Sequence, residues 1–291
     1  MPGLFLCAFL MLTLLPPAIS AQMTFSRRVY SEKDRSYQQI WMWNPSEGSF
    51  TPITKSDRNH FSPECSADGK YIWFRSGSEA SDDSELWRFD RKSSVEQKFS
   101  PSKPVAVKAA AMAECVQPVW AQDKSRFACA KGRNIFLYEA KTKRLIGKPL
   151  FTERRTPPTV VGWSQNGKWL LVSTVGESDN STSRQSDFFI LNIGRMAWIP
   201  AGAGNDAKWI PGSARIVYST PRELEPITPS SKHQEWTAHL VMFDPETRRR
   251  AQVTTGVTND IQPAACAAGA YQPDKRSKLR PSKKAESAAR K

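Results

Sequence analysis

The chain is poor in the residues and patterns that most enzymes and metalloproteins need. Its three histidines, His60, His233 and His239, are too few and too scattered for a metal site. The five cysteines show no CxxC spacing, which argues against bound zinc. No glycine-rich phosphate loop is present. The segment 162–167, Gly-Trp-Ser-Gln-Asn-Gly, differs from a nucleophile elbow, because its second glycine comes three residues after the serine instead of two. We therefore expect no metal, no cofactor and no enzymatic activity.

Long apolar runs are also scarce. The one run of note, residues 4–15, has about the length of the apolar region of a signal peptide and is too short to span a bilayer. Pro16 and Pro17 follow it, and residues 18–20 offer the small side chains that a signal peptidase reads. A buried strand or a membrane anchor is the alternative. We expect residues 1–21 to be removed and the mature protein, without a transmembrane segment, to be periplasmic or secreted.

A repeat runs through the rest of the chain. Five times, a tight turn leads into a β-branched or aromatic run, and a second run ends at an acid or amide. The landmark residues at or just before each turn are Cys65, Trp120, Trp163, Trp209 and Ala265, spaced 55, 43, 46 and 56 residues apart. Self-similarity of this period indicates a repeat architecture. In the clearest copy, residues 62–74, two strands flank an Asp68-Gly69 turn, the pattern of a β-hairpin.

The order of the copies predicts how the repeat closes. The first copy, at Phe25, has no strand before it, and the last hairpin start, residues 262–269, has no strand after it. Joining the two ends completes one blade, and a closed ring protects sheet edges from aggregation. We predict an all-β fold, a five-bladed β-propeller over residues 22–270, with six blades as the alternative. The segment around residues 23–27 should pair with that around residues 263–267.

These repeats resemble the WD40-like (PD40) repeats of the TolB family of periplasmic propellers, which run roughly Asp, Pro, aromatic, Ser-Pro-Asp-Gly-Lys and then an apolar strand. Residues 63–70 match well, residues 163–168 carry Asn166 in place of the Asp, and residues 120–124 lack the Gly. The resemblance covers about residues 24–269. It departs from the family in blade number, six in TolB, and in the family's N-terminal α/β domain, which we do not find. The resemblance implies a non-enzymatic scaffold that binds proteins in the cell envelope.

Polar side chains gather in the loops that enter the inner strands. At the mouth of a rigid ring they suit recognition of an envelope protein or peptide, and they suit simple solvation equally well. The candidate binding residues are Asp57, Arg58, His60, Glu114, Arg155, Asp206 and Asp260. We expect Asp206 and Asp260 to be exposed loop residues. The alternative is a glycoside hydrolase or carbohydrate-binding protein with paired carboxylates over a central cavity. Its candidates are Glu64, Glu114, Asp206 and Asp260.

Four cysteines remain once Cys7 leaves with the signal peptide. They are Cys65, Cys115, Cys129 and Cys266, an even number that permits two disulfides in an exported protein. Three pairings are possible. Cys65 with Cys266 is preferred, because both lie near equivalent inner-strand positions of adjacent blades. Four free thiols are the alternative.

The charge of +14 is unevenly placed along the chain. Residues 272–291 contain eight basic residues against two acidic ones and no aromatic or β-branched side chain. Such a segment cannot bury enough apolar surface to fold, so we expect residues 271–291 to be disordered. The tail can solubilise the protein or bind an anionic envelope surface. Nucleic acid is not an expected partner of an exported protein.

Overall fold

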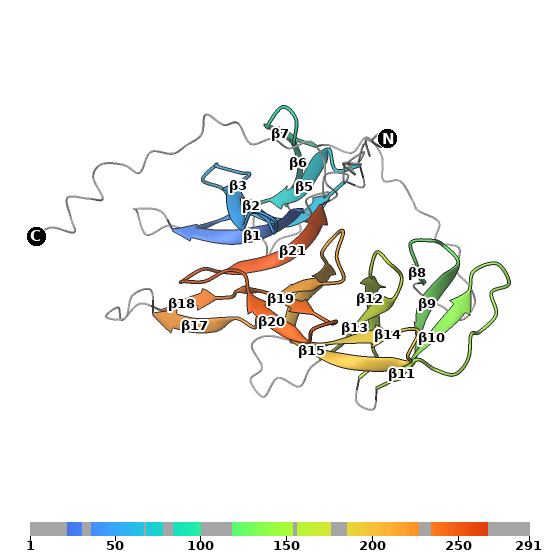
Figure 1. Ribbon diagram of the computed structural model, residues 1–291. Helices are drawn as coiled ribbons and strands as arrows, with labels where there is room; N and C mark the ends of the chain where they lie inside the picture. The colour runs from blue at the N-terminus through green and yellow to red at the C-terminus, as the bar shows by residue number, and fades with distance from the viewer. Residues whose placement is uncertain are drawn as a thin grey trace, which may run out of the picture.

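The computed structural model describes residues 22–30, 36–66, 68–77, 84–99, 118–153, 156–175, 185–226 and 234–266 (Figure 1). The predicted signal peptide, the basic tail, Glu114 and Arg155 lie outside these ranges. Every regular element of the described chain is a β-strand, so the predicted all-β class is confirmed. No helix in these ranges is long and apolar enough to cross a membrane.

The strands form antiparallel sheets, which we name A to E. Sheet A has the order β21 (Asp260–Cys266), β1 (Gln22–Tyr30), β2 (Ser36–Asn44), β3 (Ser49–Pro52). Sheet B has the order β4 (His60–Cys65), β5 (Tyr71–Ser76), β6 (Glu85–Asp90), β7 (Val95–Lys98). Sheet C has the order β8 (Val119–Trp120), β9 (Arg126–Lys131), β10 (Asn134–Glu139), β11 (Phe151–Thr152).

Sheets D and E form one seven-stranded array that shares β15 (Ala197–Trp209). Residues 197–204 of β15 pair with β14, and residues 205–209 pair with β16. Sheet D adds β12 (Thr159–Trp163), β13 (Trp169–Val175) and β14 (Ser186–Asn192), and sheet E adds β16 (Ile216–Ser219), β19 (Leu240–Asp244) and β20 (Arg249–Gln252). A separate hairpin, β17 (Glu223–Pro226) and β18 (Gln234–Thr237), projects between β16 and β19.

The two ends of the described chain meet in sheet A. Met23 pairs with Ala265 and Thr24 with Ala264 in an antiparallel ladder between β1 and β21. The predicted pairing of the terminal segments is therefore confirmed. β21 is the first strand in the order of this sheet, and we call the first strand of each sheet its inner strand. The other three strands of sheet A come from the opposite end of the chain.

Four hairpins of the repeat have the same turn. The residue after each of Cys65, Trp120, Trp163 and Trp209 donates its backbone N–H to the carbonyl five residues further on, at 2.9–3.0 Å. It also accepts a bond from the backbone N–H three residues further on. The landmarks chosen from the sequence are thus equivalent positions in sheets B, C, D and E.

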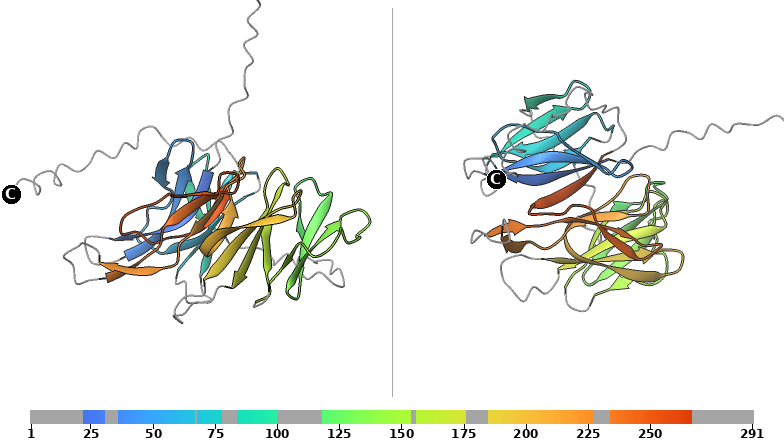
Figure 2. Two further views of the ribbon diagram at one scale, coloured as in Figure 1. Left: turned by 60° about the horizontal axis from the view of Figure 1, so that its bottom comes forward. Right: turned by 60° about the vertical axis from the view of Figure 1, so that its left-hand side comes forward.

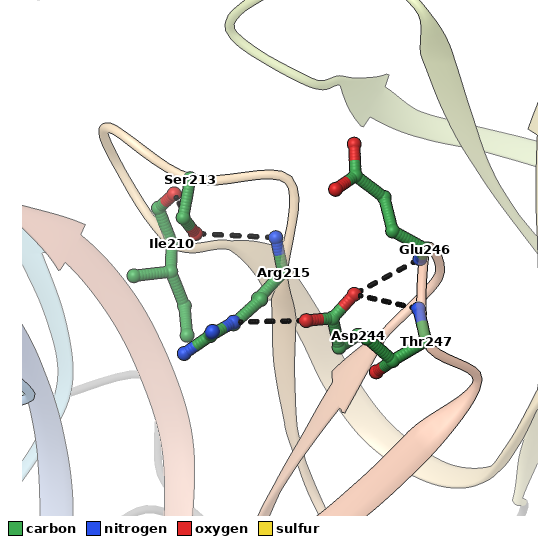
Figure 3. Close-up of polar contacts among 6 residues, drawn as sticks. All are labelled: Ile210, Ser213, Arg215, Asp244, Glu246 and Thr247. Atoms are coloured by element: carbon green, nitrogen blue, oxygen red, sulfur yellow. Dashed lines mark hydrogen bonds and ion pairs between the residues drawn. The ribbon is translucent and has the colours of Figure 1, made fainter.

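The predicted acid or amide at the end of each third strand is present in all five sheets, as Asn44, Asp90, Glu139, Asn192 and Asp244. Figure 3 shows Asp244, whose Oδ1 accepts the backbone N–H groups of Glu246 and Thr247 at 2.9 and 3.2 Å, while Arg215 Nε donates to its Oδ2 at 3.2 Å. A short side chain with an acceptor oxygen stabilises a tight turn here, because it accepts hydrogen bonds from the backbone N–H groups two and three residues later in the chain. The turn is why these strands end where they do.

The sheets follow one another in the order B, A, E, D, C (Figures 1 and 2). A separate apolar core lies between each neighbouring pair. Ile40 and Phe74 belong to the core between A and B, Phe25 and Val217 to that between A and E. Similar cores join E to D and D to C. Among the described residues, no comparable packing joins B to C, and residues 100–117 connect these two sheets in sequence.

Candidate functional site

Three inner strands each contain a β-bulge, and the three bulges line one cavity. Ser62 in β4, Asp206 in β15 and Gln262 in β21 have positive φ angles of 52°, 57° and 56°. The ladder to the next strand shifts register beside each of them. Residues other than glycine rarely adopt a positive φ. Such residues are frequent at β-bulges and at functional sites, where the bulge changes the direction of a side chain. Here all three residues line one cavity of about 390 Å³, which we name the inner-strand cavity.

The walls of the inner-strand cavity are polar, and hydrogen bonds join the strands that form them. Gln262 Oε1 accepts the backbone N–H of Ser62 at 2.8 Å and the hydroxyl of Ser26 at 3.1 Å. Glu64 and Lys208 add charges of opposite sign. The cavity can therefore offer both hydrogen-bond acceptors and hydrogen-bond donors to a polar ligand.

A disulfide joins two of the strands that line this cavity. Cys65 at the end of β4 is bonded to Cys266 at the end of β21, with the two Cα atoms 5.1 Å apart. The preferred pairing from the sequence is confirmed. Cys129 is also disulfide-bonded, and Cys115 lies outside the described residues. The Cys65–Cys266 bond fixes the inner strands of sheets A and B to each other.

A second cavity, of about 670 Å³, lies beside the loop that leads into β4, and we name it the mouth cavity. Its lining comes from sheets A and B: Ser36, Tyr37, Asp57, Arg58, Asn59, Ser76, Gly77 and Glu85. Asp57, Arg58 and Asn59 are exposed. Glu85 accepts hydrogen bonds from Lys98 Nζ at 2.6 Å and from Trp87 Nε1 at 3.1 Å. The bond from Lys98, and to a smaller extent that from Trp87, holds the pKa of the Glu85 carboxyl below its usual value.

His60 lies beneath this cavity and not on its surface. Its side chain is buried, its Nε2 is 2.6 Å from the Ser56 hydroxyl, and its ring meets the edge of Phe74 at 5.0 Å. Burial, and secondarily the charge of Arg58, lowers the pKa of His60 to about 4. The imidazole is therefore neutral at physiological pH and supports the loop from below.

The expectation that Asp260 is an exposed mouth residue is wrong. Its side chain is fully buried and forms a two-pronged ion pair with Arg27, with Nε to Oδ1 at 2.7 Å and Nη2 to Oδ2 at 2.8 Å. The Thr258 hydroxyl donates to Oδ2 at 3.0 Å. The Arg27 guanidinium also lies over the ring of Trp41, 4.8 Å from its centroid. Asp260 therefore has a structural role, since its ion pair with Arg27 joins β21 to β1.

The structure therefore divides the predicted site. Asp57 and Arg58 line the mouth cavity, Asp206 lines the inner-strand cavity, and His60 and Asp260 are buried. Glu114 and Arg155 lie outside the described residues. In the described ranges no group of three His, Cys, Asp or Glu side chains could hold a metal ion.

Sequence reasoning missed several lining residues. Tyr37 and Glu85 flank the connections between second and third strands, whereas the predicted mouth residues lie in the loops that enter the inner strands. Ser62 and Gln262 each precede a proline at the same point of the repeat, 200 residues apart in number. That repeated residue-proline pair was the available signal for the bulges.

Comparisons with known proteins found likenesses of fold only. No family model matches the chain, and no curated protein matches its sequence. Among solved structures, TolB from Acinetobacter baumannii is 13% identical, covering 88% of this chain and 69% of TolB, with a TM-score of 0.38. The propeller domain of the Trilobed protease from Pyrococcus furiosus is 16% identical over 79% of this chain and 67% of that chain (TM-score 0.31). Tricorn protease is 11% identical over 77% of this chain and 28% of its own (TM-score 0.35).

Identities of 11–16% and TM-scores of 0.31–0.38 assign this chain no function. The fold rests on the strand pairing described above, which consists of four-stranded antiparallel sheets of the kind that form propeller blades.

Proposed function

We propose that the chain is a five-bladed β-propeller acting as an exported, non-enzymatic scaffold that binds an envelope protein or peptide at the mouth cavity. Sheets A to E supply the five blades, each of four strands when β15 is counted in both D and E. Export rests on the signal peptide expected in residues 1–21. A TolB-like role in the envelope is part of the same proposal.

The observation that carries this proposal is the lining of the mouth cavity. Asp57 and Arg58 stand exposed and adjacent on a frame fixed by sheets A and B. A carboxylate accepts from lysine, arginine or backbone N–H groups, and a guanidinium binds carboxylates through two parallel bonds. Side chains of both signs on a rigid rim suit a polar protein segment with charges of both signs.

Capture by the mature protein from envelope extract tests the proposal. Asp57→Ala with Arg58→Ala should weaken recovery of a specific protein at least about tenfold, with an unchanged melting temperature, since exposed loop substitutions cost little stability. Lys92→Ala, in the exposed turn between β6 and β7 at the other end of sheet B, is the matched control and should bind normally. Equal recovery by all three proteins would contradict the proposal. Loss only on deletion of residues 272–291 would move the site to the tail.

One observation favours a second candidate function. Glu64 and Asp206, both among the carboxylates considered for glycoside hydrolysis, line the same inner-strand cavity. A pair of carboxylates around one cavity is what that chemistry requires. Assaying a panel of glycosides with wild type, Glu64→Gln and Asp206→Asn tests it. Hydrolysis that both variants abolish would replace the scaffold proposal with an enzyme.

A further inference from the structure

Two sheets each present an aromatic face that no other described sheet covers. On sheet C, Phe127 stacks on Tyr138 at 5.1 Å and contacts Trp120 at 4.8 Å between ring centroids. The Phe127 cluster draws all its described members from sheet C, whereas each of the other four clusters spans two sheets. Trp120 is 46% exposed. Phe127 itself is fully buried, so Trp120 is the exposed aromatic of this group. Tryptophan side chains exposed in this way are enriched at interfaces.

Sheet B carries the matching face. Trp73 meets Phe99 edge-on at 4.9 Å and lies near Tyr71 at 6.3 Å. The Arg88 guanidinium lies 4.7 Å from the Tyr71 ring centroid. In β5, Ile72 and Phe74 point the other way, into the core shared with sheet A. The alternation of a β-strand thus leaves Tyr71 and Trp73 on the face turned away from sheet A.

A repeated hydrogen bond shows what should cover sheet C. Trp209 of sheet E donates its indole N–H to the carbonyl of Gly162 in the inner strand of sheet D, at 3.0 Å. Trp163 of sheet D donates in the same way to Val119 in the inner strand of sheet C, at 2.8 Å. In both cases the acceptor is the residue just before the landmark of the preceding sheet. Trp163 is only 9% exposed as a result.

Trp120 is the equivalent landmark of sheet C, as its hairpin bonds establish. Sheet B precedes it in the chain, with landmark Cys65. The residue before that landmark is Glu64, whose carbonyl is therefore the acceptor that the repeat assigns to Trp120.

We propose that the aromatic faces of sheets B and C bind each other and close the ring at a fifth interface, with the Trp120 indole N–H donating to the Glu64 carbonyl. This inference rests on the five-blade ring proposed above. Closure places the Trp120 ring beside Glu64, and so at the edge of the inner-strand cavity.

Hydroxyl-radical footprinting read by mass spectrometry tests the interface, because tryptophan oxidation follows solvent exposure. The chain contains its own references, Trp163 at 9% exposure and Trp198 at 47%. In the full mature protein, Trp120 should be oxidised within about twofold of the Trp163 rate and several-fold more slowly than Trp198. Oxidation of Trp120 at the Trp198 rate would overturn the proposal.

A variant identifies the covering surface. Trp73→Ala removes the centre of the sheet B face and should raise Trp120 oxidation several-fold while Trp163 stays protected. Trp198→Ala is the matched control and should leave Trp120 protected. Protection that survives Trp73→Ala, or that disappears on dilution as a second copy dissociates, would also overturn the proposal. The measurement needs no partner, and the mouth cavity lies between sheets A and B, so its outcome is separate from that of the capture experiment.

Discussion

At the scale of single residues, His60 shows how burial turns a predicted contact residue into a support. A histidine in a loop sequence reads as a polar, titrating group. In the structure it lies beneath Arg58, bonded to Ser56 and packed on Phe74. Its pKa of about 4 follows mainly from the cost of charging a buried imidazole.

This pKa predicts that stability falls as the solution is acidified. Unfolded His60 takes up a proton near pH 6.5, whereas folded His60 does so only near pH 4. Its contribution is fully present above pH 6.5 and is lost as the pH falls from there toward 4, by roughly 2–4 kcal/mol. Urea unfolding at pH 7.5, 6 and 5 should show a shallower pH dependence for His60→Gln than for wild type. Ser56→Ala keeps the imidazole and should keep the wild-type dependence. Equal slopes for wild type and His60→Gln would contradict the assignment.

At the scale of strands, β1 and β21 are joined by more than their backbone ladder. The Arg27–Asp260 ion pair is bidentate, with a fully buried Asp260 carboxylate and an Arg27 side chain that is 17% exposed, and it connects residues 233 positions apart. Removing the carboxylate from such a pair leaves the Arg27 charge uncompensated where it is largely, though not fully, withdrawn from water.

Asp260→Ala should therefore destabilise the protein by about 3–5 kcal/mol, measured by denaturant unfolding. Replacing both partners, Arg27→Met with Asp260→Leu, should recover most of that loss. Lys98→Ala removes the exposed pair with Glu85 and should cost less than about 1 kcal/mol. A loss for Asp260→Ala no larger than that for Lys98→Ala would show that the buried pair contributes little.

The strands show what could be predicted from sequence and what could not. Alternation and turn residues such as Asp244 are local signals, so the third strands and the pairing of the chain ends were predicted correctly. The positive φ of Asp206 depends on how β15 meets β16, which no local pattern encodes. The burial of Asp260 depends on Arg27 at the other end of the chain. The sequence therefore predicted the exposed positions of Asp57 and Arg58, but neither the burial of Asp260 nor the place of Asp206 in a strand.

At the scale of the whole molecule, the Cys65–Cys266 bond spans 201 residues and encloses most of the described chain. A cross-link that closes a long loop restricts the unfolded chain, and removing one typically costs about 2–5 kcal/mol. The double variant Cys65→Ser with Cys266→Ser should fold and should unfold at a correspondingly lower denaturant concentration. An unchanged midpoint would show that other contacts of sheets A and B already supply the constraint.

β15 has a further consequence for how the molecule can move. It passes from sheet D to sheet E between Gly204 and Asn205 without leaving the strand conformation. The passage is tight, because a Cβ on Gly204 would lie 2.1 Å from the Ser219 carbonyl oxygen. A hinge needs a loop or element end that absorbs changes in φ and ψ, and this crossing has neither. Sheets D and E should therefore turn as one rigid body, leaving the other interfaces of the ring as the places where it can pivot.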